Sequence, residues 1–171
     1  MNGPPESSAT GAPAGVPGWD REGDLDQARA QIGCRVADLG AAPGHSLWLA
    51  PADRPDHQLA RITESGTSPV VGSDCALWTW SAADLDRLSR LLQERNGVLV
   101  FLEPTAGLGL RRAGQRLGRP WFERRLGHHF ERDVPAELRA AGFIVTTQVR
   151  FRHGLVGDYV RGEARHFRPA G

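Results

Sequence analysis

The sequence predicts an α/β fold in which parallel strands are followed by a C-terminal antiparallel hairpin. Ser73–Trp80 and Val98–Leu102 are short apolar runs, typical of buried strands, and a helical pattern separates them. Phe143–Phe151 alternates between apolar and polar residues, and Asp158–Phe167 follows six residues later as a second extended segment. The 171 residues are enough for one domain of this kind.

The N-terminal part contains few elements with a clear pattern. Residues 1–18 hold eight Gly or Pro and almost no apolar side chains, which predicts a disordered tail before a single domain over 19–171. A short helix is expected over Asp24–Ile32, with Asp24 as N-cap and Gly33 as its end. Cys34–Asp38 then predicts a short strand that enters the turn Leu39–Gly44. Residues 45–72 are the hardest stretch to interpret: His45–Leu49 fits either a strand or a helix, and Pro51, Pro55 and Pro69 interrupt the elements around them.

The pattern is clearest between residues 81 and 102. Ser81 followed by Asp84 is a capping box that begins a helix, and Asn96-Gly97 ends it. One face of this helix carries leucines and the other carries charged residues. The leucines are Leu85, Leu88, Leu91 and Leu92, and the outward residues are Arg87, Arg90, Glu94 and Arg95.

The C-terminal part begins with an Arg- and Gly-rich stretch, residues 104–132, which predicts a broken helix over the carboxyl edge of the sheet. Asp133 is expected to cap a helix over Val134–Ala141, which Gly142 ends. The alternation in the following strand places its apolar residues on one face. These are Phe143, Val145, Val149 and Phe151.

Composition excludes several classes of function. All 21 basic residues are Arg, so lysine Schiff bases and the P-loop lysine are excluded. The net charge of +1 gives no general attraction to nucleic acid. Cys34 and Cys75 are too few for a disulfide framework and are expected to be buried thiols. With no apolar run near about 18 residues and no signal-peptide pattern, a cytoplasmic protein is expected.

The turn Asp38-Leu39-Gly40-Ala41-Ala42-Pro43-Gly44 is a candidate binding loop. An acidic residue at a strand end, followed by small residues, lets the backbone approach a ligand and offers N–H groups to a carboxylate or phosphate. Turns rich in small residues are common in proteins, so a plain turn is the alternative interpretation.

The order of elements and several motifs resemble the carboxyl-terminal half of class I S-adenosylmethionine-dependent methyltransferases. The resemblance is closest to the type-11, methyltransferase-like (thiol methyltransferase-like) group, and it covers about residues 73–168. The matching motifs are Phe101-Leu102-Glu103-Pro104, Pro120-Trp121, Gly127-His128-His129-Phe130-Glu131-Arg132-Asp133, Leu138, Ala141-Gly142-Phe143 and Val160-Arg161-Gly162-Glu163-Ala164-Arg165.

This resemblance implies a Rossmann-like methyltransferase sheet, S-adenosylmethionine as cofactor and a small-molecule substrate. It implies that Asp38, Gly40, Ala42 and Gly44 form the cofactor loop and that Trp78 lies at the rim of the methyl-donor pocket, although packing is the alternative for Trp78. Glu103 would fix a neighbouring loop through hydrogen bonds. The family also places an acidic residue after its second strand, to hold the ribose hydroxyls, and residues 45–72 offer no strand followed by such an acid.

The spacing of the strands predicts an incomplete sheet. In the family, three crossovers and two strands separate the first and fourth strands, which needs roughly 46 residues. Residues 39–73, between Asp38 and Asp74, number only 35. At least one strand–helix unit is therefore expected to be missing.

His128 and His129 are the candidate catalytic residues. In a methyltransferase this segment lies over the cofactor end, where a neutral His accepts a proton from a thiol or hydroxyl nucleophile. Adjacent residues on a helix do not share a face, so the pair does not predict a metal site. A surface or capping role is the alternative for both.

A basic cluster between Arg111 and Arg125 is a candidate contact for an anionic surface, such as a membrane. It has few interleaved aromatic residues, which argues against nucleic acid. An incomplete sheet has an open edge, so a homodimer is also expected. Three hypotheses remain open: a small-molecule methyltransferase, an inactive methyltransferase-like protein that acts through protein contacts, and a module that binds anions or a membrane surface.

Overall fold

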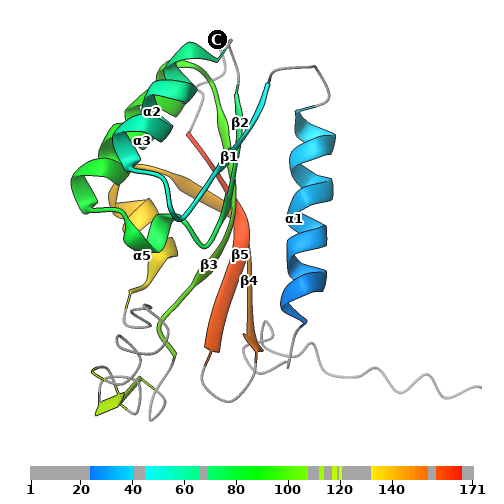
Figure 1. Cartoon of the computed structure of the whole chain (residues 1–171), viewed down its shortest axis with the longest axis vertical. Helices are drawn as coiled ribbons and strands as arrows, with labels where there is room; N and C mark the ends of the chain where they lie inside the picture. Colours follow the sequence, from blue (N-terminus) through cyan, green and yellow to red (C-terminus); the bar gives the residue numbers. More distant parts are fainter. Residues whose placement is uncertain are drawn as a thin grey trace, which may run out of the picture.

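The computed structural model describes residues 24–40, 45–65, 69–107, 112–113, 117–118, 120, 132–153 and 157–166. Its elements, labelled in Figure 1, follow one another along the chain. They are α1 (Leu25–Leu39), β1 (Ser46–Leu49), α2 (Pro55–Glu64), β2 (Val70–Asp74), the 3-10 helix η1 (Leu77–Thr79), α3 (Ala82–Glu94), β3 (Val98–Pro104), α5 (Val134–Ala140), β4 (Ile144–His153) and β5 (Gly157–Arg165).

The five strands form one mixed sheet in the order β1-β2-β3-β5-β4. Strands β1, β2 and β3 are parallel, whereas β5 is antiparallel to both β3 and β4. Of the described helices, α2, α3 and α5 cover one face and α1 lies against the other (Figure 1). The predicted fold class, parallel strands with a C-terminal antiparallel hairpin, is confirmed.

The main core lies between the sheet and the α2, α3 and α5 layer. The capping box of α3 is present, because Ser81 and Asp84 each bond the other's backbone N–H. Leu85, Leu88 and Leu92 are fully buried on the predicted face. Asn96 ends this segment in the left-handed conformation at φ 54°, so the predicted end of the helix is confirmed.

Helix α1 differs from the prediction. Asp24 caps it as expected, but the helix continues through Gly33 to Leu39, so the strand predicted over residues 34–38 is wrong. The buried residues Ala28, Ile32 and Val36 recur every four positions, and their cluster includes Val70 of β2 and Val100 of β3. Packing of this stripe on the sheet outweighs the helix cost of glycine, about 1 kcal/mol. The first strand is β1, Ser46–Leu49, so of the two alternatives for His45–Leu49 the strand is confirmed.

The strand predicted over residues 73–80 is only partly correct. Strand β2 ends at Asp74, and Cys75 then takes a left-handed backbone conformation at φ 55°. Leu77–Thr79 form the 3-10 helix η1. The apolar residues after Asp74 are buried because this short helix packs into the core, not because the strand continues.

The hairpin forms as predicted, but its apolar residues do not share one face. A β-bulge between Val145 and Thr147 shifts the register of β4 against β5 by one residue. Phe143 and Val145 consequently pack in the α2, α3 and α5 core, whereas Phe151 packs with α1 on the opposite face. The prediction of a single apolar face is wrong because one inserted residue inverts the alternation.

Other expectations have mixed outcomes. The tail over residues 1–18 lies outside the described residues, as does most of 104–132. Cys34 is exposed on α1 and Cys75 is half-buried, so the prediction of two buried thiols is wrong for Cys34. Among the described helices, none combines the length and the hydropathy that crossing a bilayer requires.

Candidate functional site

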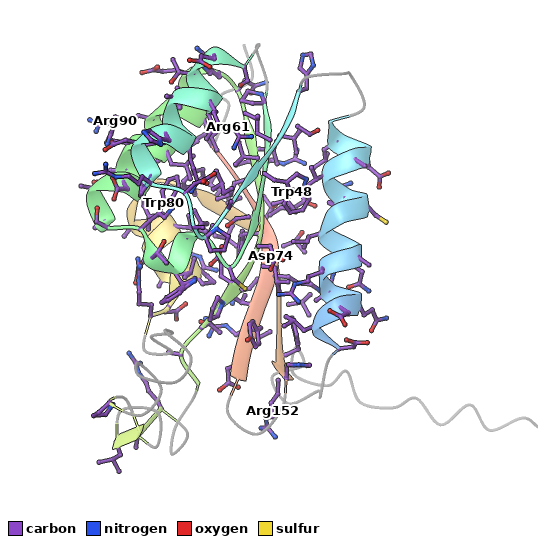
Figure 2. The ribbon with its side chains drawn as sticks, viewed as in Figure 1. Trp48, Arg61, Asp74, Trp80, Arg90 and Arg152 are labelled. Carbon is purple, nitrogen blue, oxygen red and sulfur yellow. The ribbon has the colours of Figure 1, made fainter. Side chains whose placement is uncertain are left out.

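The candidate site is the edge of the sheet at which β1, β2 and β3 end. In open parallel sheets, ligands bind outside the carboxyl ends of the strands. Those ends are Leu49, Asp74 and Pro104. The N-terminal part of α1 lies at the same edge, because Arg29 Nε donates to Asp74 Oδ2 over 2.9 Å. Figure 2 labels Asp74 within this region.

Glu103 organises the loop that follows β2. Its carboxylate is fully buried on the α3 side of the sheet. Oε1 accepts hydrogen bonds from the Ser73 hydroxyl and from the N–H groups of Ala76 and Leu77, at 3.2 and 3.1 Å for the two amides. Oε2 accepts from the Trp78 N–H over 3.1 Å. The expectation that Glu103 fixes a loop is confirmed, and the loop is the one that leads into η1.

Two opposing effects determine the ionisation of Glu103. Burial disfavours the charged form, whereas the bonds from Ser73 and from the three amides favour it. Burial is the larger effect, and the pKa of Glu103 is raised from 4.5 to about 7. Among the described residues, its partners belong to β2 and the loop after it, so this carboxyl holds that loop in place.

Asp74 and Cys75 form a second polar group on the α1 side of the same edge. Asp74 is paired with Arg29, and this ion pair is partly exposed. Burial and the nearby charges of Glu103 and Asp74 raise the pKa of the Cys75 thiol well above its usual range. A thiol in this state is a poor nucleophile. Burial also raises the pKa of Tyr159, whose ring stacks on Phe151 at 5.9 Å between centroids.

The carboxyl end of β1 is closed by Gln58 of α2. This buried side chain accepts from the Ala50 N–H over 3.0 Å and donates to the carbonyls of Ala50 and Asp53, both over 2.8 Å. The backbone groups that a bound ligand would meet at this strand end are therefore already bonded within the chain.

Arg132 joins three parts of the edge. Its side chain donates to the Glu137 carboxylate, over 3.0 Å from Nε to Oε1, and to the carbonyl of Trp78. Its own carbonyl accepts from the Ala106 N–H over 2.9 Å. The chain thus leaves the sheet after β3 and returns before α5 at one place, beside η1.

The structure places the described residues of the predicted cofactor loop away from Trp78. Asp38 and Gly40 lie at the C-terminal end of α1, and the turn they begin leads into the start of β1, at the opposite edge from the strands' carboxyl ends. Ala42 and Gly44 lie outside the described residues. The prediction that this turn binds the cofactor assumed a strand over residues 34–38, and those residues belong to helix α1.

The remaining predicted site residues have different outcomes. Trp78 lies at the carboxyl edge, where its N–H bonds Glu103 and its indole packs against the main core. His128 and His129 lie outside the described residues, so their catalytic role stays a prediction. Of the basic cluster between Arg111 and Arg125, only Arg112 is described, and it is exposed.

Sequence reasoning missed three residues that organise this edge: Ser73, Gln58 and Arg132. A serine inside an apolar strand and an arginine just before a helix cap are weak signals in isolation. Arg132 lies in a motif that carries the family resemblance, so this motif was its one available signal. In the part of the chain that is described, no three His, Cys, Asp or Glu side chains are grouped to hold a metal ion.

Two solved structures are distantly similar to this chain. No protein-family model matches the chain, and no curated protein matches it. A human N-acetylserotonin methyltransferase, crystallised with S-adenosylmethionine, aligns over 58% of this chain and 29% of its own length, with 17% identity and a TM-score of 0.37. A possible exported protein from Bordetella parapertussis aligns over 83% of this chain and 68% of its own length, with 15% identity and a TM-score of 0.38. At these identities and TM-scores, neither protein's activity transfers to this chain.

Proposed function

We propose that this chain is a methyltransferase-like domain of the S-adenosylmethionine-dependent class, which acts on a small molecule. Its ligand side is the carboxyl edge of β1, β2 and β3. The main support is Glu103. It ends the Phe-Leu-Glu-Pro strand that carries the family resemblance, and it bonds the loop after the neighbouring strand, as that resemblance implies. The parallel strands with a terminal antiparallel hairpin agree with the same class of fold.

Catalysis by such a domain depends mainly on position. The cofactor supplies an activated methyl group, and the protein holds the acceptor in line with it. At this edge, Asp74 and Arg29 are paired polar side chains that remain partly exposed to solvent. Glu103 bonds the N–H of Trp78 and Arg132 bonds its carbonyl, so the backbone that carries the Trp78 side chain is held in place.

The part of the site at the end of β1 supports only weak cofactor binding. Strands β1 and β2 pair directly, and the described residues between them form helix α2, so the acid that the family resemblance places after its second strand has no counterpart there. Gln58 also occupies the backbone groups at the end of β1. Two charge-assisted hydrogen bonds at about 1.5–3 kcal/mol each separate a micromolar site from one weaker than about 0.1 mM. We therefore expect the isolated chain to bind S-adenosylmethionine with a Kd above about 0.1 mM.

A second candidate function is favoured by the internal bonding of this edge. The N–H groups of Ala50, Ala76, Leu77 and Trp78 all have partners within the chain. An edge with its donors already satisfied also suits a methyltransferase-like protein that no longer carries out methyl transfer and acts through contacts with other molecules.

Calorimetric titration with S-adenosylmethionine and S-adenosylhomocysteine tests the proposal, together with amide NMR spectra of the same samples. We expect weak binding, with shifts concentrated at residues 74–80 and 104–107. No binding or shifts at millimolar ligand would favour the second candidate. Micromolar binding with shifts near Leu39–Ser46, lost in Gly40→Val, would instead support the turn predicted from the sequence.

A matched pair of substitutions distinguishes ligand binding at the two edges of the sheet. Asp74→Asn removes a partly exposed carboxylate at the carboxyl edge, whereas Asp38→Asn removes an exposed one at the opposite edge. We expect Asp74→Asn, and not Asp38→Asn, to change the affinity for S-adenosylmethionine. An equal effect of the two variants would contradict the proposed location.

A further inference from the structure

The α1 face of the sheet contains a small cavity that the proposed function does not use. It lies between α1 and strands β4 and β5, and its volume is about 60 Å³. Its polar lining comes from Gln31 and Arg35 of α1, Thr147 of β4, and Arg161 and Glu163 of β5. Gln31, Arg35 and Thr147 are exposed at its rim, so the cavity opens to solvent.

Arg161 is the central feature of this cavity. Its side chain is half-buried, and among the described residues it makes no hydrogen bond or ion pair. Burial lowers the pKa of its guanidinium, and no neighbouring carboxylate opposes this effect. A partly desolvated guanidinium with its donors unused is suited to bind an oxyanion with two parallel hydrogen bonds.

The surrounding charges leave the cavity positive. Among the described residues that line it, Glu163 is the carboxylate, and it already accepts from two arginines: Arg35 at 2.5 Å and Arg165 at 3.2 Å. Asp38 adds a further negative charge one turn along α1 from Arg35. Counting Arg161, three positive charges face two negative ones, so an incoming anion meets a net attraction.

The size and lining of the cavity limit what it can hold. A buried water needs about 10–15 Å³, so this space holds a few waters or one small anionic group, but not a nucleotide. Thr147 offers a hydroxyl and Gln31 an amide as further donors. Val149 is 39% exposed and gives the rim an apolar wall against which the rest of a ligand can lie.

We propose that Arg161, together with Arg35, binds the carboxylate or phosphate group of a small molecule in this cavity. The site lies on the opposite face of the sheet from η1, so it does not depend on the proposed methyl transfer. Thr147 supplies a third donor because the β-bulge at Val145–Thr147 places it on this face, opposite Glu163.

The test is an NMR titration of the full chain with inorganic phosphate and, separately, with succinate. Ionic strength is held constant with sodium chloride, and the arginine Nε–H signals and the amides of residues 145–149 and 160–164 are followed. We expect saturable shifts in these groups. Tighter binding of phosphate identifies a phosphate group as the ligand chemistry, and tighter binding of succinate identifies a carboxylate.

Arg161→Gln is expected to weaken binding at least tenfold. Arg90→Gln, on the outer surface of α3 (Figure 2), removes an equal charge from a distant place and is the matched control, expected to leave binding unchanged. Val149→Glu keeps Arg161 but puts a carboxylate at the cavity rim, and it is expected to abolish binding. Shifts that do not saturate, or equal binding by Arg161→Gln and Arg90→Gln, would overturn the proposal.

Discussion

Ser73 of β2 donates a hydrogen bond to the carboxylate of Glu103 on the adjacent parallel strand β3, and both side chains are buried. This contact explains two polar residues inside otherwise apolar strands. The serine satisfies part of a carboxylate that would otherwise be costly to bury. The carboxylate in turn holds three consecutive backbone amides and so determines the course of the chain after β2.

The first prediction is a dependence of stability on pH that originates at Glu103. Its pKa is about 7 in the folded chain, above the ordinary 4.5, so between these values the folded state binds more protons than the unfolded state. The free energy of unfolding should therefore fall as pH rises from 4.5 to 7, by about 3 kcal/mol at 1.4 kcal/mol per pKa unit. Urea unfolding at a series of pH values measures this change.

Glu103→Gln is the matched variant for this measurement. It keeps an oxygen for Ser73, Ala76 and Leu77 but cannot ionise, so its pH dependence over this range should be smaller. Burial lowers the pKa of His166, which gives an opposite slope below its ordinary value of 6.5, and this group is present in both proteins. Identical pH profiles would show that Glu103 does not titrate in this range.

The second prediction concerns the bonds of Arg132. Arg132→Ala leaves the Trp78 carbonyl and the Glu137 carboxylate without this donor, and an unsatisfied, partly buried group costs about 1–3 kcal/mol. Amide hydrogen exchange should become faster at residues 76–80, where the arginine holds η1. Arg139→Ala, on the exposed side of α5, should leave this exchange unchanged. Equal exchange rates in the two variants would contradict the role of Arg132.

The elements that sequence analysis predicts correctly are those with strong local signals. The capping box at Ser81 and the apolar run of β3 depend on neighbouring residues alone, and both appear in the structure. Helix α1 is different, because its continuation past Gly33 depends on packing against Val70 and Val100, far along the chain. The four-residue strand β1 is too short to show a pattern.

The candidate site is less predictable than the fold. Glu103 is recognisable because a carboxylate ends a buried strand, but its partners come from another strand and from the loop after it. Gln58 reaches Ala50 from a helix for which the sequence shows no clear pattern. The Asp38–Gly44 segment looks like a binding loop in sequence, and only the topology shows that Asp38 and Gly40 lie at the opposite edge of the sheet.

The third prediction tests the orientation of α3. Leu88 has no exposed surface and lies in the main core, so Leu88→Ala should lower the free energy of unfolding by about 2–5 kcal/mol. Arg87 is on the outer face, where it pairs with Asp56 at 2.6 Å, and Arg87→Ala should have little effect. Denaturant unfolding of both variants decides this, and similar losses in the two would rule out the orientation.

The fourth prediction is that Gly33→Ala stabilises the protein. Gly33 lies in the middle of α1, and a Cβ atom added there would meet no other atom within 4 Å. Alanine is favoured over glycine inside a helix by about 0.5–1 kcal/mol, so the thermal midpoint should rise. At Gly40 the added Cβ would lie 3.0 Å from both the Ser46 side chain and the Val36 carbonyl, so Gly40→Ala should give no such gain. A lower midpoint for Gly33→Ala would contradict a continuous α1.

The last prediction uses the β-bulge that inverts the faces of β4. The bulge lies between Val145 and Thr147, and a Cβ atom at Gly162 would overlap the Thr147 carbonyl oxygen and lie 2.9 Å from the Phe101 ring. Neither neighbour can move freely, since one is backbone and the other is buried, so Gly162→Ala should cost at least about 1–3 kcal/mol. Urea unfolding measures the loss, and Gly33→Ala is the control in which the same substitution has the opposite sign. If Gly162→Ala were as stable as the unsubstituted chain, the bulge would not lie where Thr147 faces Glu163, and the cavity beside Arg161 would lose one of its walls.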